Sequence, residues 1–455
     1  MEQSGYTLPR WRRLAYGFGD FGFNLYWATT SLYLLYFYTD VLGLPNQVAG
    51  LIMLVALVWD GITDPVMGYI AERTRSRWGS YRPYILFGAL PLSATMVLMF
   101  YAPEAEGMAL IIYAAATHVL MRTVYTVMSI PFSSLSARMT RSSEVRNELA
   151  AFRMVFATLA GLFVAFFTLR LVAWFGAGDA ATGFFWTACL YAALSLPIFL
   201  FVFLTTREPP VDIDASRSRP NLKIALSSLR TNGPFLIVFT ATVLSVAAGV
   251  MASKTLIYYY KYNLGDEQAS GTALAFITGG AAVFVPIWAW VTSETSKRFV
   301  WSTGLAISFC VSLALWFNPI ETVPMVTALF ALGAAGSAAG YLSFWSMLPD
   351  TVEYGEWQTG ERTESLVFGL MSLAQKASFG IAAGVLGILL DAVGYSANEM
   401  QAEETLGGLK AIMTLLPAAL IGAAFLLVRT YPLDRQLHAR LERAIARRRT
   451  VTSPT

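Results

Sequence analysis

The sequence predicts an all-α membrane protein of about twelve transmembrane helices, arranged in two six-helix halves. Hydrophobic residues make up 56% of its 455 positions and charged residues 13%. Soluble domains have about 45 to 50% apolar and about 25% charged residues. Apolar stretches of membrane-spanning length recur along the whole chain. One long polar interruption divides these stretches into six plus six.

The expected spans are apolar runs of roughly twenty residues or more. The first run carries Asp20 and Asn24 and lacks a signal-peptide pattern, so we expect it to remain as the first helix. The predicted spans are 14–38, 47–71, 83–102, 108–133, 149–175, 182–204, 234–262, 269–292, 299–318, 323–349, 364–394 and 406–429.

The interruption from Thr205 to Thr231 contains Pro209-Pro210 and several charges, which is typical of a linker. Two six-helix halves joined in this way are the layout of the major facilitator fold, where substrate binds near the midplane between the halves. The predicted parts are an N-terminal half at 1–204, a cytoplasmic linker at 205–231, a C-terminal half at 232–430 and a basic cytoplasmic tail at 431–455.

Lys and Arg occur in alternate loops, whereas intervening loops such as 102–106 and 176–179 contain none. The positive-inside rule then places both termini in the cytoplasm, for a multi-pass protein of the cell inner membrane. The tail from Leu433 is expected to lie as an amphipathic helix on anionic lipid. The net charge of +3 is small, so nucleic acid is not an expected partner.

Two carboxylates, Asp60 and Asp64, stand deep inside the run 47–71. Each costs about 2.5 to 3.5 kcal/mol near mid-membrane, and the spacing of four puts both on one helix face, which should contact protein rather than lipid. Ionised about 6 Å apart, they repel by roughly 3 kcal/mol at an effective dielectric of about 20. A bound monovalent cation would relieve this, so we predict a metal-cation site. The alternative is a structural pair, neutralised by protonation or by nearby Arg and Lys.

A mixed polar and aromatic stripe runs along the first helix, where Asp20, Asn24, Trp27 and Ser31 follow at spacings of four, three and four. A sugar needs hydrogen-bonding partners for its hydroxyls and an aromatic surface for its apolar ring face. We therefore predict a sugar site here, with a purely structural network as the alternative.

The fourth helix carries a similar polar stripe of Arg122, Thr126, Ser129 and Ser133. An Arg at mid-span must be paired or solvated. We expect Arg122 to form a salt bridge with a carboxylate such as Asp20 or Asp60. The alternative is a clamp on an anionic group of the substrate.

Intramembrane charges leave one surplus positive charge, which a carboxylated substrate would balance. Lys254 weakens this inference if it reaches outward to the membrane surface. The groups counted are Asp20, Asp60 and Asp64 against Arg122, Arg153, Lys254 and Lys376.

A charged gate between the halves is a further expectation. Arg73, Arg75 and Arg77 follow the second helix, and acidic partners are expected in the loop after the tenth helix. Exposed pairs contribute only about 0 to 1 kcal/mol each, so only a network would act as a gate, and ordinary solvated loops are the alternative. The acidic residues are Asp350, Glu353 and Glu356.

Several motifs resemble the glycoside-pentoside-hexuronide:cation symporters, the family of melibiose permease. They are Tyr16-Gly17-Phe18-Gly19-Asp20, Tyr36-Phe37-Tyr38-Thr39-Asp40-Val41-Leu42-Gly43-Leu44, Trp59-Asp60 with Asp64-Pro65, Arg73-Thr74-Arg75-Ser76-Arg77-Trp78-Gly79, Ile130-Pro131-Phe132 and Leu348-Pro349-Asp350. The resemblance implies sugar transport driven by sodium, lithium or protons.

The resemblance also implies roles for particular residues. Asp60 and Asp64 match the cation carboxylates, with Thr63 and Thr126 as neutral ligands, and Asp20 matches the carboxylate that binds sugar hydroxyls. Arg153 and Lys376 match basic residues beside these sites. The sequence departs at Ser129, where melibiose permease has a second sugar-binding Asp, and at Ser133, where it has an aromatic residue. The predicted substrate residues are Asp20, Asn24, Trp27, Arg122, Ser129, Arg153, Tyr341 and Lys376.

These observations predict a secondary active symporter of a sugar, glycoside or hexuronide that has no cofactor beyond its coupling cation, Na⁺ or H⁺. A carrier of an amphipathic, lipid-like solute is the alternative within the same superfamily. A membrane-embedded enzyme has no support, since the sequence lacks GxxxxGK[ST], HExxH and CxxCH motifs. The expected partners are a small sugar, a cation and membrane lipid.

Overall fold

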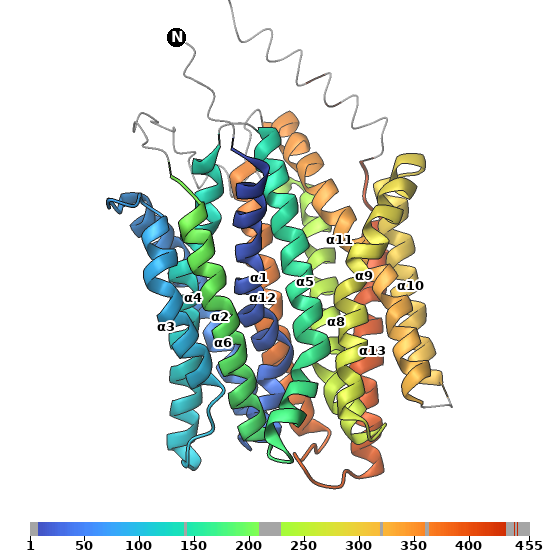
Figure 1. The fold of residues 1–455 in the computed structure, drawn as a ribbon. Helices are drawn as coiled ribbons and strands as arrows, with labels where there is room; N and C mark the ends of the chain where they lie inside the picture. The colour runs from blue at the N-terminus through green and yellow to red at the C-terminus, as the bar shows by residue number, and fades with distance from the viewer. Residues whose placement is uncertain are drawn as a thin grey trace, which may run out of the picture. The chain divides into compact units, whose positions relative to one another are not determined.

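The computed structural model describes residues 8–140, 143–208, 229–318, 322–359, 364–433, 441 and 444. Within these residues the chain forms twelve α-helices and one π-helical turn (Figure 1). The first elements are α1 (Arg10–Tyr36), η1 (Phe37–Val41), α2 (Asn46–Arg73), α3 (Arg82–Met99), α4 (Gly107–Met139), α5 (Ser143–Gly176) and α6 (Ala180–Thr205). The others are α8 (Gly233–Tyr262), α9 (Glu267–Glu294), α10 (Lys297–Phe317), α11 (Val323–Thr359), α12 (Glu364–Ala392) and α13 (Glu403–Arg429).

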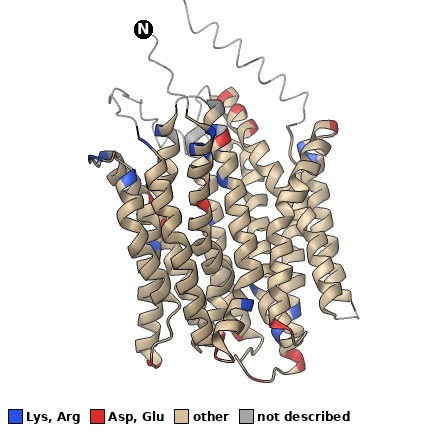
Figure 2. Cartoon of the chain, viewed as in Figure 1, with Lys and Arg blue, Asp and Glu red and all other residues tan. Residues whose placement is uncertain are grey.

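Eleven of these helices, α2–α6 and α8–α13, are long and apolar enough to cross a membrane. The predicted helices are thus confirmed, with most ends within a few residues of the expected positions. Helix α1 is the twelfth, and it carries the polar stripe that begins at Asp20. Figure 2 shows that most charged residues of the described chain lie near helix ends, while the middle of the helices is largely uncharged.

One boundary was wrong. The acidic residues after the predicted tenth span were expected in a loop, but α11 continues without interruption to Thr359. Asp350, Glu353 and Glu356 therefore lie on its last turns, at the helical spacing of three that also places them on one face. Pro349 lies inside this helix and does not end it.

Two compact units make up the chain. Unit 1 comprises Met1–Ile213, Tyr260–Gly279 and Ala383–Thr405, and unit 2 comprises Asp214–Tyr259, Gly280–Ala382 and Leu406–Thr455. Two segments from the second half of the sequence thus group with the first half. The predicted halves remain a prediction, and most of the linker and of the basic tail lies outside the described residues.

Unit 1 is built on close helix packing. Helix α1 runs along α5 and α6, and α2 and α3 both pack on α4. The approach of α1 to α5 requires a glycine, since a Cβ at Gly17 would lie 2.6 Å from Cβ of Phe152. Tyr16 is fully buried beside it, stacks on Phe132 with ring centroids 4.6 Å apart, and donates a hydrogen bond to the Phe132 backbone oxygen at 2.7 Å.

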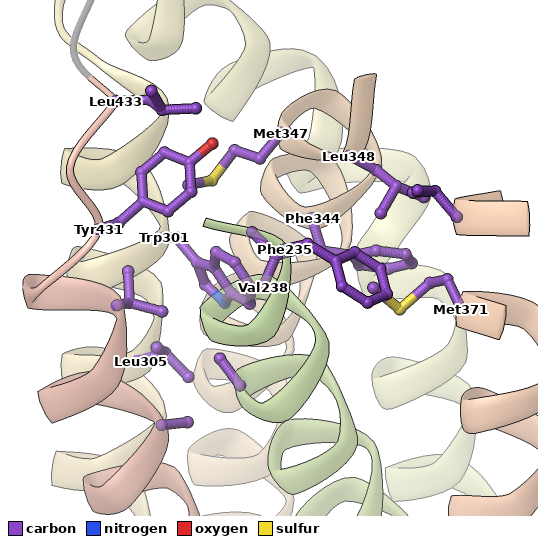
Figure 3. Close-up of a cluster of buried hydrophobic side chains, with 14 of the residues drawn as sticks. Phe235, Val238, Trp301, Leu305, Phe344, Met347, Leu348, Met371, Tyr431 and Leu433 are labelled. Atoms are coloured by element: carbon purple, nitrogen blue, oxygen red, sulfur yellow. The ribbon is translucent and has the colours of Figure 1, made fainter. Parts of the chain in front are cut away.

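Unit 2 has its own apolar core. Figure 3 shows Trp301, Phe235, Phe344 and Met371 among the buried side chains that form it. Helices α10 and α11 approach closely, because a Cβ at Gly336 would lie 2.5 Å from the backbone oxygen of Gly304. Small residues at helix contacts are typical of membrane proteins, where packing rather than the hydrophobic effect drives association.

Candidate functional site

Asp20 of α1 and Arg153 of α5 form a bidentate pair inside unit 1. Arg153 Nε donates to Asp20 Oδ2 at 2.5 Å and Nη2 donates to Oδ1 at 3.2 Å. Arg153 Nη2 also donates to Ser133 Oγ at 3.2 Å, and its guanidinium lies 5.1 Å from the ring centre of Phe132. Asn24 Nδ2 donates to the Asp20 backbone oxygen at 2.8 Å. This end of the predicted sugar stripe is therefore a polar network within the protein, and its role toward a sugar stays a prediction.

Asp60 of α2 pairs with Arg122 of α4. Arg122 Nη1 lies 3.1 Å from Asp60 Oδ2, and both side chains are buried, with 10% and 6% of their surface exposed. The Arg122 guanidinium also lies 4.8 Å from the ring centre of Trp27 on α1. The expected salt bridge of Arg122 with an intramembrane carboxylate is thus confirmed, and its partner is Asp60 rather than Asp20.

Asp64 lies one helical turn further along α2 and accepts a hydrogen bond from Thr126 Oγ1 at 2.9 Å. The pairs Asp60–Arg122 and Asp64–Thr126 both join residues 62 positions apart, so α2 and α4 run in the same direction in fixed register. We call these four residues the α2–α4 ladder. It places one positive and one neutral donor opposite two carboxylates.

Asp60 faces protein, as the sequence predicted for both carboxylates, and Asp64 is half-buried. Asp60 is 4% exposed, whereas Val58 and Ile62 on the other faces of α2 are 57% and 59% exposed. Thr63 Oγ1 donates to the backbone oxygen of Trp59 in its own helix at 3.0 Å. Ser129, one turn beyond Thr126 on α4, is half-buried. Cation and sugar roles for Thr63 and Ser129 stay predictions.

Among the described residues, no group of three or more His, Cys, Asp or Glu is placed to hold a metal ion. The predicted cation site is a different arrangement, with two carboxylates and neutral oxygens. A monovalent coupling ion at such a site would be cargo of transport.

The remaining predicted substrate residues belong to unit 2 and are described there alone. Tyr341 lies on α11, with its ring 5.8 Å from that of Phe344, and Lys376 lies on α12 and is half-buried. Lys254 on α8 is only 4% exposed, which does not fit the alternative that it reaches outward. Substrate contact by Tyr341 and Lys376 stays a prediction.

The predicted gate residues lie in separate units. In unit 1, Arg73 stacks on Tyr69 and Arg77 on Trp78, with 3.4 Å and 4.1 Å from guanidinium carbon to ring centre. Arg75 follows α2 directly and is exposed. A gate formed by these residues with the acidic end of α11 stays a prediction.

Within unit 2, the acidic end of α11 has a basic partner on α10. Lys297 Nζ donates to both carboxylate oxygens of Asp350, at 2.9 Å and 2.8 Å, and to the Ser346 backbone oxygen at 2.8 Å. Glu356 is buried and Glu353 is half-buried on the same helix. This pairing was not predicted from the sequence.

Another buried carboxylate, Asp40, was not predicted as part of any site. It lies on the π-helical turn η1, and such turns frequently mark functional positions. Its carboxylate accepts hydrogen bonds from Lys261 Nζ at 2.8 Å, Tyr262 Oη at 2.7 Å, Tyr395 Oη at 2.8 Å and Thr39 Oγ1 at 2.8 Å. These contacts, all within unit 1, use the roughly four acceptor positions of a carboxylate. We call this group the Asp40 cluster.

Further hydrogen bonds surround the Asp40 cluster. Asn398 Nδ2 donates to the Asp40 backbone oxygen at 2.6 Å, and Lys261 Nζ also donates to Tyr36 Oη and Asn398 Oδ1. The signal available in the sequence was a pair of opposite charges, Asp40 and Lys261, each at the end of an apolar run and each next to tyrosines. Pairing them requires knowledge of contacts more than 200 residues apart.

The many helices long and apolar enough to cross a membrane, with buried ion pairs inside them, define a multi-pass membrane protein. The chain belongs to the family described as MFS/sugar transport protein, whose sequence model matches residues 15–435. The predicted major facilitator fold is confirmed.

Individual relatives agree with this family. The chain is 32% identical to the uncharacterized symporter YnaJ of Bacillus subtilis, over 96% of this chain and 94% of that protein. It is 30% identical to the isoprimeverose transporter of Lactiplantibacillus pentosus, over 94% and 90%. A solved bacterial homologue of the human lysosomal transporter Spinster is 13% identical and superposes with a TM-score of 0.69, covering 94% of this chain and 98% of that chain. At that identity, the likeness concerns the fold alone.

Proposed function

We propose that this protein is a cation-coupled symporter that carries a sugar or glycoside across the cell inner membrane by alternating access, with both termini in the cytoplasm. The observation that carries the proposal is the α2–α4 ladder, in which two carboxylates one turn apart are held inside a membrane-spanning helix pair. Charged groups at this depth are costly and mark ion or substrate pathways. The relative named as an isoprimeverose transporter supports a sugar as the substrate class.

The proposed roles follow the family resemblance of the sequence motifs. Asp60 and Asp64, with Thr63 and Thr126, form the cation site. Trp27 offers an aromatic surface for the sugar. The other proposed substrate residues are Asp20, Asn24, Ser129, Arg153, Tyr341 and Lys376, and the proposed gate consists of Arg73, Arg75 and Arg77 with Asp350, Glu353 and Glu356.

Buried Lys254 keeps the surplus of intramembrane positive charge that a carboxylated substrate would balance, whereas the contacts of the two arginines argue against an anion clamp. Both guanidiniums near the sugar stripe already contact carboxylates, Arg153 with Asp20 and Arg122 with Asp60. An anion clamp at Arg122 would have to compete with Asp60. Uptake of glucuronides compared with that of matched neutral glucosides therefore decides the substrate charge, and transport current distinguishes the two, because an anion moving with one cation is electroneutral.

A ligand panel tests the proposed function. Detergent-purified protein is heated with neutral glycosides, pentosides, hexuronides and lysolipids, each in the presence and absence of sodium and at several pH values. We expect at least one glycoside to raise the melting temperature and to accumulate in proteoliposomes that carry an imposed cation gradient. Stabilisation by lysolipids alone, with no sugar taken up, would reject sugar symport in favour of a lipid-like solute.

A further inference from the structure

We propose that Arg122 is a resident counter-cation of Asp60 that competes with the coupling cation, so that this one residue sets the ion affinity of the transporter. The inference rests on the proposed function and adds to it the residue that controls ion binding. Its basis is that the Arg122 guanidinium is already paired with Asp60, the carboxylate to which the coupling ion would bind.

Two contacts from different helices hold the Arg122 guanidinium in place. It pairs with Asp60 on α2 at 3.1 Å and lies over Trp27 on α1 at 4.8 Å. Arg over Trp is the favourable cation–π combination, and it is strongest where water is excluded. With only 10% of the Arg122 side chain exposed, both contacts are shielded from solvent. The position is therefore built by the fold.

The positive charge at this position is permanent, because an arginine side chain stays protonated in proteins. On the neighbouring elements α1 and η1, two buried carboxylates already have basic partners: Asp20 pairs with Arg153, and Asp40 pairs with Lys261. The basic residue that pairs with Asp60 itself is Arg122. The repulsion between Asp60 and Asp64, from which a cation site was predicted, is already relieved in part by the protein.

An alkali cation that binds to both Asp60 and Asp64 is repelled by the positive charge of Arg122. For two positive charges about 5 Å apart at an effective dielectric of about 20, the repulsion weakens cation binding on the order of a hundredfold. The cation would also compete for Asp60 Oδ2, the oxygen closest to Arg122. Tight binding of such a cation therefore requires the guanidinium to leave Asp60.

The test is a sodium titration of purified full-length protein, with choline chloride at equal ionic strength as the control. Binding is read from the melting temperature and by calorimetry in the wild type, in Arg122→Gln and in Arg122→Lys. We expect sodium to bind on the order of a hundredfold more tightly to Arg122→Gln than to the wild type. Arg122→Lys keeps the positive charge and should stay within a few-fold of the wild type.

A double variant locates the effect. Adding Asp60→Asn to Arg122→Gln should remove the gained sodium affinity, because the released carboxylate is then absent. Arg122→Met, which keeps the apolar stem against Trp27, replaces Arg122→Gln if the latter does not fold. Sodium binding to the neutral variant that is no tighter than binding to the wild type would overturn the proposal.

The outcome is separable from the proposed function, because it is read from ion binding rather than from uptake. If the neutral variant gains sodium affinity while the wild type transports no sugar, the competition is supported and sugar symport is rejected. Cation-driven sugar uptake with no gain in affinity supports symport and rejects the competition.

Discussion

The α2–α4 ladder and the Asp40 cluster both bury carboxylates in unit 1, yet they are assembled differently. The ladder joins two neighbouring helices through residues 62 positions apart. The Asp40 cluster joins η1 to Lys261, Tyr262, Tyr395 and Asn398, which lie more than 200 positions away. In the ladder, α4 supplies both donors, so a carboxylate can exchange its donor for a cation without separating distant segments of the chain. In the Asp40 cluster, each donor ties a distant segment to the same carboxylate, which suits a structural clamp.

Neutralising the ladder should have the largest effect on transport. In Asp64→Asn we expect accumulation of substrate to fall from a ratio on the order of fiftyfold, the equivalent of one charge in a 100 mV potential, to about one. Substrate exchange without energy input should persist, because the substrate site keeps its side chains. Uptake and counterflow in the same vesicles check this, with Asp64→Glu as the control. Full accumulation by Asp64→Asn would show that the ladder does not carry the coupling ion.

Breaking the Asp40 cluster should act mainly on stability. In Asp40→Asn the buried Lys261 ammonium loses its carboxylate, and removal of one partner from a buried pair costs about 3 to 5 kcal/mol. Since the Lys261 side chain is 20% exposed, the lower end of that range applies. We expect a melting temperature several degrees below that of the wild type, measured by differential scanning fluorimetry. Tyr395→Phe, which removes one neutral donor at a cost of about 1 kcal/mol, should lower it less. Equal melting temperatures in all three proteins would contradict the clamp.

Asp20 tests whether one carboxylate serves both stability and substrate binding. Asp20→Asn should lower the melting temperature, because Arg153 loses its bidentate partner, and should weaken substrate binding if Asp20 accepts sugar hydroxyls. Adding Arg153→Gln removes the uncompensated charge, so it should restore much of the melting temperature. Substrate affinity of the double variant then decides the role, and an affinity within a factor of about three of the wild type would leave Asp20 as a structural residue.

The smallest effect is expected at Asp179, an exposed carboxylate that caps α6. It accepts hydrogen bonds from the Thr182 hydroxyl and from the backbone N–H groups of Thr182 and Ala181. These bonds lower the pKa of Asp179, so its contribution to stability is present at neutral pH and is lost as the pH falls through that lowered pKa. Asp179→Ala should reduce the melting temperature slightly at pH 7, with uptake unchanged. The difference from the wild type should disappear in acid, and a difference that grows there would contradict this reading.

The contrast between the two carboxylate groups explains what could be predicted from the sequence. The two carboxylates of the ladder could be predicted because a spacing of four residues on one helix is a local property of the sequence. The Arg122 salt bridge could be predicted from the cost of burying a charge. The Asp40 cluster could not be predicted from the sequence, since its residues meet only through tertiary packing. The continuation of α11 was missed because acidic residues suggested a loop, although they sit at helical spacing. The pairing of Asp20 with Arg153 needed the side-chain geometry.

The length of α11 has a mechanical consequence. Its 37 residues rise about 55 Å, whereas the hydrocarbon core of a bilayer is about 30 Å thick. A helix of this length exceeds the thickness of the hydrocarbon core, and its acidic residues Asp350, Glu353 and Glu356 all lie near one end. A rigid tilt of a helix by about 10° displaces a point about 25 Å from its pivot by about 4 Å. Pulsed electron–electron double resonance resolves a distance change of this size. A spin label at the exposed Trp357 would report movements of the buried part of α11 that are too small to follow directly.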